Sequence, residues 1–341
     1  MSLLINEIAS RQVLTSYNFA RISNKVFAEV VTPQQYAKLS SNNTYEIYSN
    51  SNQVLYKKKL LEIQENDIIF CNTYLIEALF KELNKIKNLT NVKIITSQTD
   101  HLITKKLFNK KPTCVSDWFS INVGHRDDSL HPIPLGLSNN YSEKNLHQNS
   151  YINLKRNYNK KKSIYTNFQV NTNYFHRRGL QKLTTNGNLF KNSDANLSLS
   201  EYLQNLNDYK FTICPWGNGI DTHRLWETLY AGSIPIVKNH MTYKTLDDLN
   251  AILVDSHRDI TEEILDEHNT SKKFDVEKLT ISYWNNLMCA REVNSTESHI
   301  LNHSEEQNEY TKYSYYQSLK RENYIKELMT FQRKILKKLN Y

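Results

Sequence analysis

The stretch FTICPWGNGIDTHRLWETLYAGSIPIV, residues 211–237, decides the fold of this chain of 341 residues. It holds three of the seven glycines, two of the six prolines and two of the four tryptophans. Its pattern predicts a strand over residues 210–214, a loop through Gly219, a helix over residues 222–231 and a second strand over residues 234–237. In so glycine-poor a chain, this clustering indicates a backbone that turns tightly or approaches a ligand closely.

The helix expected over residues 222–231 carries groups suited to a nucleotide sugar. Asp221 or Thr222 is positioned to cap its N-terminus, where unpaired N–H groups and the helix dipole attract anions. Arg224 and Glu227 share one face, because residues three apart are neighbours on a helix surface. A guanidinium can grip a diphosphate bidentately, and a carboxylate one turn later can accept both ribose hydroxyls. The alternative is an ordinary ion pair between Arg224 and Glu227 on an exposed helix.

Two α/β patterns lie along the chain. The first is a strand at residues 67–71, a helix over residues 74–86 that Asn72 can cap, and a strand at residues 92–96. Strand, helix and strand in so short a span form a βαβ unit with parallel strands. The second pattern runs over residues 163–267 and includes the stretch quoted above.

This order of elements predicts an α/β fold of two Rossmann-like domains that face a cleft, with a C-terminal helical extension. The first domain is expected over residues 1–150 and the second over residues 160–300, joined through the polar stretch at residues 138–162. Residues 301–341 are expected to form a helical segment that docks back on the body. Ligands of such sheets bind outside the carboxyl ends of the strands.

Residues 211–237 resemble the exostosin-like glycosyltransferases. The shared pattern is an apolar strand, a Pro- and Gly-containing loop, an acidic cap, an Arg, an aromatic–acidic pair, and a small residue followed by Gly, an apolar residue and Pro. The matching residues are Cys214-Pro215, Gly217-Asn218-Gly219, Asp221, Arg224, Trp226-Glu227, Ala231-Gly232 and Ile234-Pro235. Weaker similarity at residues 133–137, at residues 165–168 and at Trp284 extends the resemblance to roughly half of the chain.

The resemblance implies a GT-B fold and inverting transfer of a sugar, in the synthesis of surface polysaccharides or glycoconjugates. The nucleoside-diphosphate sugar would bind the C-terminal domain, and a glycan or lipid-linked glycan acceptor would bind the N-terminal one. The expected donor-binding residues are Asn167, Arg177, Arg178, Gly217, Gly219, Asp221, His223, Arg224 and Glu227. Eukaryotic exostosins carry an N-terminal membrane anchor that this sequence does not show, so a cytoplasmic enzyme is expected.

Inverting transfer needs a general base for the acceptor hydroxyl, projecting from the N-terminal domain. Asp100 follows the strand at residues 92–96 and would lie at its carboxyl end, which makes it the first candidate. His101 is its neighbour, and Asp117 is the next candidate along the chain. The alternative for Asp100 is that it caps a helix over residues 102–108.

The net charge of +8 favours an anionic partner. No D-x-D pair occurs among the 14 Asp residues, so no metal or other cofactor is expected. Cationic side chains and a helix dipole would then stabilise the departing diphosphate. Two alternatives stay open: a non-catalytic nucleotide-sugar-binding protein, and a nucleic-acid-binding protein. The second would require basic residues clustered with aromatics, whereas the basic residues are spread along the chain and concentrate in the terminal helix, so no nucleic-acid partner is expected.

Basic residues concentrate in the tail at residues 310–341, where a helix with an apolar face through Leu328, Ile335 and Leu339 is expected. This helix either docks on the protein body or rests on an anionic membrane surface, which would make the enzyme peripheral at the inner face of a membrane. No stretch of about 18 uncharged apolar residues is present, so no membrane-spanning helix is expected.

Overall fold

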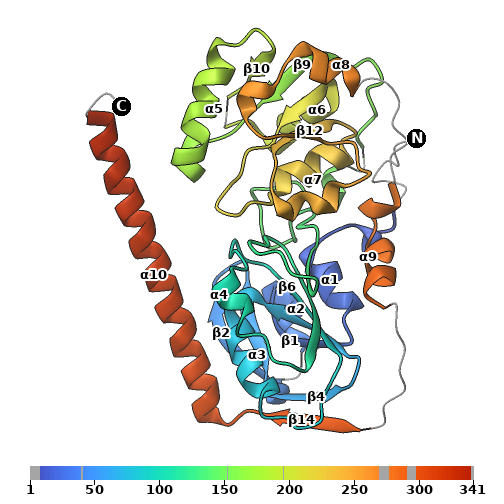
Figure 1. The fold of residues 1–341 in the computed structure, drawn as a ribbon, viewed down its shortest axis with the longest axis vertical. Coiled ribbons are helices and arrows are strands. Elements are labelled where there is room, and N and C mark those ends of the chain that lie inside the picture. The colour runs from blue at the N-terminus through green and yellow to red at the C-terminus, as the bar shows by residue number, and fades with distance from the viewer. Residues whose placement is uncertain are drawn as a thin grey trace.

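The structure, a computed structural model, describes residues 8–39, 41–151, 153–194, 196–268, 276–289 and 297–338. Two main sheets with flanking helices form two halves of the molecule, one above the other in Figure 1. We call the half around the seven-stranded sheet the first half and the half around the five-stranded sheet the second half. The expected α/β class is confirmed.

The first half is built on a mixed sheet whose central strands are parallel. In sheet order its strands are β2 (Thr44–Ser49), β3 (Val54–Lys58), β1 (Lys25–Val31), β5 (Ile68–Asn72), β6 (Val92–Ser97), β7 (Val115–Ser120) and β8 (Leu130–Pro132). β3 pairs antiparallel with both β1 and β2. β5 is buried at every position, as its uninterrupted apolar run predicts for a strand covered on both faces.

The helix caps of the first half agree only in part with the sequence-based expectation. The Asn72 side chain accepts a hydrogen bond from the Tyr74 N–H at 3.1 Å and so caps the 3-10 turn that leads into α3 (Ile76–Leu83). The helix expected over residues 102–108 is shorter: α4 spans Lys105–Phe108, and Thr104 caps it. The alternative role of Asp100 as a helix cap is therefore wrong.

The second half is built on a parallel sheet. In sheet order its strands are β10 (Phe190–Asn192), β9 (Lys161–Thr166), β11 (Tyr209–Ile213), β12 (Ile234–Lys238) and β13 (Ile252–Val254). Its helices are α5 (Tyr174–Asn186), α6 (Leu199–Asp208), α7 (His223–Tyr230) and α8 (Glu262–Glu267). The strand, loop, helix and strand expected at residues 210–237 thus appear as β11, α7 and β12.

One apolar core runs from the first half into the second. Phe70 and Phe119, from β5 and β7, belong to the same buried cluster as Tyr165 of β9 and Trp226 of α7. α1 (Ser16–Ile22) contributes the buried Phe19 to it. Because the core is shared, the carboxyl ends of β6 and β7 and the loop after β11 are held close together.

The chain returns to the first half before the expected boundary at residue 300. α9 (Ile281–Met288) packs on α1, and β14 (Ser298–Asn302) pairs antiparallel with β4 (Leu60–Gln64). The expected division at residues 300 and 301 therefore differs from the structure, because main-chain pairing with β4 places β14 in the first half. The remaining short helix, α2 (Pro33–Ala37), carries a capping box from Thr32.

The C-terminal helix α10 spans Glu305–Lys338 and runs along one side of the molecule from β14 towards the second half (Figure 1). Its first part docks on the first half, where Asn308, Thr311 and Tyr315 are buried. This part of the helix thus packs on the body. None of the helices in the described ranges is long and apolar enough to cross a membrane.

Candidate active site

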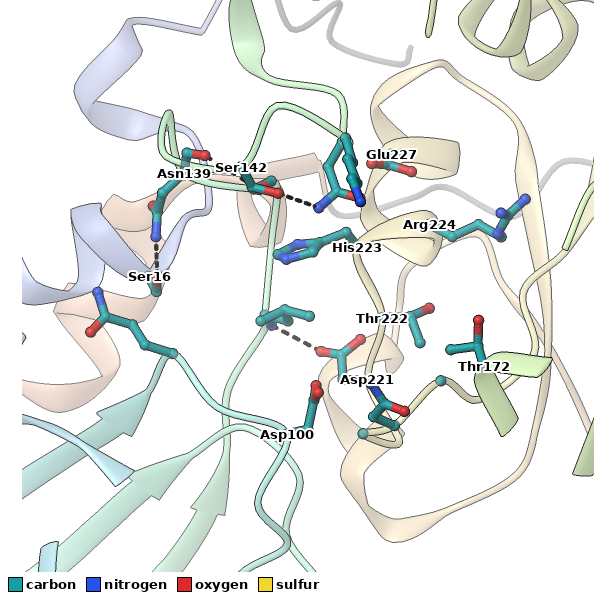
Figure 2. A pocket seen from close by; sticks show the side chains of 18 of the residues that line it. Ser16, Asp100, Asn139, Ser142, Thr172, Asp221, Thr222, His223, Arg224 and Glu227 are labelled. Atoms are coloured by element: carbon teal, nitrogen blue, oxygen red, sulfur yellow. Dashed lines mark hydrogen bonds between the residues drawn. The ribbon is translucent and has the colours of Figure 1, made fainter. Parts of the chain in front are cut away.

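A cavity of about 550 Å³ lies where the two halves meet. Residues after β6 line it from the first half, and the loop after β11 with the start of α7 lines it from the second. Figure 2 shows Asp100 on the first side and Thr222, His223 and Arg224 on the second. This is the edge at which open parallel sheets place their ligands.

Gly219 lets the loop after β11 approach the first half. A methyl group on it would lie 2.7 Å from Asn122 Nδ2 and 3.2 Å from Asp100 Oδ1. The Asn122 side chain cannot easily yield, because its Oδ1 accepts a 2.7 Å hydrogen bond from the Asp221 N–H. At Gly217 a methyl group would meet nothing closer than 3.4 Å, so close approach explains only the second glycine of the pair.

Thr222 is the N-cap residue of α7 by position, but its side chain does not cap the helix. Its Oγ1 is buried without a hydrogen-bond partner, and the residue lines the cavity. Asp221 does not cap the helix either, so the expected capping role is wrong for both side chains. A buried hydroxyl with no protein partner at a helix N-terminus is available to a ligand anion.

Arg224 lies in the first turn of α7 and lines the cavity. Its guanidinium stacks over the Tyr202 ring, with Cζ 5.2 Å from the ring centroid, and its Nη1 is buried without a partner. Within the described part of the chain, no ion pair joins Arg224 to Glu227. The alternative of an ordinary surface ion pair is therefore wrong.

Glu227 is buried and already engaged by protein donors. Its Oε2 accepts from the Tyr202 hydroxyl at 2.8 Å, and its Oε1 accepts from the Leu146 N–H at 3.2 Å. The residue still lines the cavity, and each carboxylate oxygen can accept a further hydrogen bond. The structure thus adds an orienting role that the sequence did not predict.

His223 projects into the cavity from the first turn of α7 (Figure 2). Its Nδ1 lies 2.8 Å from the Gly136 carbonyl oxygen, so a neutral ring carries its proton on Nδ1. Gly136 adopts a φ of +72°, and a methyl group there would lie 2.1 Å from the Leu14 carbonyl oxygen. The acceptor for His223 therefore depends on glycine, and the second ring nitrogen is left for a ligand.

The three candidate bases lie in different surroundings. Asp100 lines the cavity, and within the described residues no hydrogen bond or ion pair engages its carboxylate. His101 turns towards α10, with Nδ1 3.2 Å from Glu322 Oε1. Asp117 lies on β7 outside the cavity, with Oδ1 2.8 Å from His131 Nε2. The structure thus brings Asp100 to the site and leaves Asp117 away from it, since residue 117 precedes the carboxyl end of its strand.

Arg177 braces the glycine loop. Its guanidinium donates to the carbonyl oxygens of Trp216 at 2.7 Å, Gln169 at 2.9 Å and Pro215 at 3.2 Å. Burial, together with the charge of Arg224, lowers its pKa to about 10. Main-chain carbonyls take three of its five N–H donors, and Arg177 lines the cavity, so the expectation that it reaches the diphosphate stays a prediction.

Of two further expected donor-binding residues, the structure places one in the cavity lining and the other outside the cavity. Arg178 lies outside the cavity, with its Cζ 5.7 Å from the centroid of the Tyr174 ring, so it is not brought to the site. Asn167 does line the cavity, and its amide donates to the Asp194 carbonyl oxygen.

Several cavity residues carry no sequence signal. Ser16 and Asn139 are joined by a 2.5 Å hydrogen bond across the cavity wall, and Tyr202 lies under Arg224. Ser16 and Tyr202 come from segments that show neither a glycine cluster nor a strand end in the sequence, and Asn139 lies just after the stretch at residues 133–137. Among the described residues, no group of three or more His, Cys, Asp or Glu side chains is arranged to hold a metal ion.

Asp221 joins the two halves. Its carboxylate accepts from the Leu135 N–H at 2.9 Å and from Trp226 Nε1 at 2.9 and 3.0 Å. Burial raises its pKa to about 7 although these hydrogen bonds act in the opposite direction. Asp221 thus links the two sides of the cavity, and because it also lines the cavity, its expected contact with the donor stays a prediction.

The raised pKa of Asp221 predicts a pH-dependent stability. Between about pH 4 and pH 7 the folded protein keeps a proton that the unfolded chain releases, so rising pH lowers the free energy of unfolding. Replacing Asp221 by Asn removes this titration. We expect the difference in unfolding free energy between pH 5 and pH 7 to shrink by about 2 kcal/mol in urea titrations of the variant. An identical pH dependence in wild type and variant would contradict the assignment.

Residues 147–336 match the family model of the RXYLT1 C-terminal domain, which belongs to a xylosyltransferase-related family. The match covers slightly more than half of the chain and includes the glycine loop, α7 and nearly all of α10. No curated protein matches the chain. The expectation of a glycosyltransferase family is confirmed at this level, while the exostosin-like relationship stays a prediction.

Proposed function

The chain belongs to the RXYLT1 C-terminal domain family, and from this premise we propose that it is an inverting glycosyltransferase of the GT-B type. Its substrates in this proposal are a nucleoside-diphosphate sugar and a glycan acceptor. Two sheets whose parallel strands end at a shared cavity support the GT-B assignment. Surface polysaccharide or glycoconjugate synthesis and a cytoplasmic location stay predictions.

One observation carries the proposal. Thr222 Oγ1 and Arg224 Nη1 are both buried without a protein partner, and both residues line the same cavity at the start of α7. A diphosphate placed there would receive the hydroxyl, the guanidinium and the positive end of the helix dipole. Buried polar atoms are costly when unpaired, so binding such an anion would gain the hydrogen bonds that the protein alone lacks.

The acceptor can reach the donor cavity through a neighbouring groove. A groove of about 670 Å³ runs between α10 and the segment at residues 171–175, and it shares Asp100, Thr172 and Asn218 with the donor cavity. Tyr74, Tyr174 and Phe175 line it with aromatic rings, which suit the apolar faces of sugar rings. We assign this groove to the acceptor, so that Asp100 lies where the two substrates meet.

The reaction then follows as a single displacement. Asp100 accepts the proton of the acceptor hydroxyl, whose oxygen attacks the anomeric carbon from the face opposite the diphosphate. The new glycosidic bond forms as the bond to the diphosphate oxygen breaks, and the nucleoside diphosphate leaves with the electron pair. Arg224 and the α7 terminus stabilise the charge that develops on the leaving group. His223 Nε2 is close enough to the same cavity to hold a phosphate or sugar oxygen.

The test is a panel of UDP-, GDP-, CMP- and ADP-sugars, scored first by saturation-transfer NMR and then by sugar hydrolysis or transfer. We expect one nucleoside-diphosphate class (UDP, GDP or ADP) to bind and its sugar to be released or transferred, with activity unchanged in excess EDTA. Binding without turnover would favour the non-catalytic nucleotide-sugar-binding protein. Absence of binding to every donor would overturn the proposal, and loss of activity in EDTA with recovery in Mn²⁺ would overturn its metal-free form.

A further inference from the structure

The second part of α10 lies clear of the protein body. Glu322 ties α10 to the first half. Its carboxylate accepts a hydrogen bond from the Tyr74 hydroxyl at 2.7 Å and lies 3.2 Å from His101 Nδ1. From residue 323 to residue 335 every side chain is exposed except Arg333, which is partly covered. Figure 1 shows this part of the helix as a rod that stands beside the second half. A helix segment that exposes apolar side chains over its length is a candidate interaction surface.

The exposed segment carries apolar side chains on the face turned away from the groove. Glu322, Lys326, Met329 and Arg333 line the groove on the inner face. On the outer face, four apolar residues repeat at intervals of four, three and four and so form one stripe. This outer stripe consists of Tyr324, Leu328, Phe331 and Ile335, which are 62%, 44%, 62% and 42% exposed.

The positive charge of the same segment indicates what kind of partner would cover it. Residues 320–338 contain seven Lys and Arg against two Glu. The basic residues are Lys320, Arg321, Lys326, Arg333, Lys334, Lys337 and Lys338, of which Lys326 and Arg333 line the groove on the inner face. Pairing with a second copy of this chain would bring two strongly basic helices together, which like-charge repulsion opposes. An anionic lipid surface offers both an apolar phase for the outer stripe and negative charge for its flanks.

We propose that the outer stripe of α10 binds anionic membrane surfaces, with the helix lying in the interface and its apolar side chains inserted below the headgroups. This goes beyond the proposed transfer reaction and does not depend on it. Because the inner face of the same helix lines the groove assigned to the acceptor, membrane binding would hold that groove beside the lipid surface. The glycan of a lipid-linked acceptor would then reach the groove past α10, across about 10 Å, the diameter of the helix.

The test is co-sedimentation of the full chain with vesicles of phosphatidylcholine alone and of phosphatidylcholine mixed with phosphatidylglycerol. We expect binding to the mixed vesicles, release by high salt, and little binding to the neutral ones. Replacing both Leu328 and Phe331 by Ser should weaken binding about tenfold or more, the factor expected from losing a buried Leu or Phe side chain. The control is Leu287→Ser on α9, where a leucine with an exposed fraction of 53%, between those of Leu328 and Phe331, lies outside the stripe.

Three results would overturn the proposal. The first is unchanged vesicle binding by the double variant, and the second is equal binding to neutral and anionic vesicles. The third is a dimer of the wild-type protein, seen by light scattering without lipid, that the double variant dissociates, because the stripe would then be an interface between two copies. All four residues of the outer stripe are exposed, so unchanged thermal unfolding of the variants confirms that folding is not the cause.

Discussion

Replacing Asp100 by Asn is expected to lower turnover by about 10²–10⁴-fold while the donor dissociation constant changes little. The carboxylate lines both the donor cavity and the acceptor groove, and no protein donor in the described chain competes for it. Asn keeps the shape of the side chain but cannot accept the proton. Turnover and donor affinity should be measured on the same purified variant, because only their separation identifies a base.

Asp117→Asn is the matched control for this prediction. It makes the same chemical change in the same half of the molecule, but Asp117 lies on β7 against His131 and outside the cavity. We expect turnover close to that of the wild type. If Asp100→Asn also kept near wild-type turnover, the base would have to be sought elsewhere. The structure then points to His223, whose Nε2 is free for a ligand, rather than to His101, which faces Glu322.

Replacing Arg224 by Ala is expected to weaken donor binding about tenfold or more, since a hydrogen bond to a charged group contributes ~1.5–3 kcal/mol. The buried and unpartnered Nη1 is the atom that a diphosphate oxygen would satisfy. Arg224→Lys should recover only part of the affinity, because an ammonium keeps the charge without the bidentate fork. Isothermal titration with the nucleoside diphosphate measures both variants directly.

Arg178→Ala is the control for the arginine prediction. Arg178 carries the same charge in the same half of the molecule, but its guanidinium contacts the Tyr174 ring outside the donor cavity. A general effect of positive charge would weaken binding in both variants, whereas a direct contact would weaken it only in Arg224→Ala. Unchanged affinity in a folded Arg224→Ala protein would remove Arg224 from the donor site.

Elements that depend on short-range patterns are well predicted here. β11, α7 and β12 begin and end within about two residues of the expected positions, because apolar periodicity and glycine or proline breaks are local properties. The cap of α6 follows from a local pattern as well. Ser198 caps this helix, and Glu201 three residues later completes a capping box.

The strands within the first 60 residues, by contrast, do not follow from a short-range pattern. β1 lies between β3 and β5 in the sheet, so both of its partners are strands that come later in the chain. β2 mixes buried and exposed positions without a strict alternation, and a register shift interrupts its pairing with β3. Such strands owe their stability to cross-strand contacts rather than to a local pattern, so no reading of residues 1–60 alone identifies them.

What the sequence by itself determined is the chemistry available at the site: a glycine loop, a helix start with Thr222, His223 and Arg224, and a carboxylate after β6. Only the tertiary structure decided which of these groups are free to act. Arg177 and Arg224 are both arginines near the loop, yet the first is bound to three carbonyl oxygens and the second keeps a buried, unpaired nitrogen. The physical reason is that a side chain's role depends on which donors and acceptors its neighbours have already taken, and those neighbours are distant in the chain.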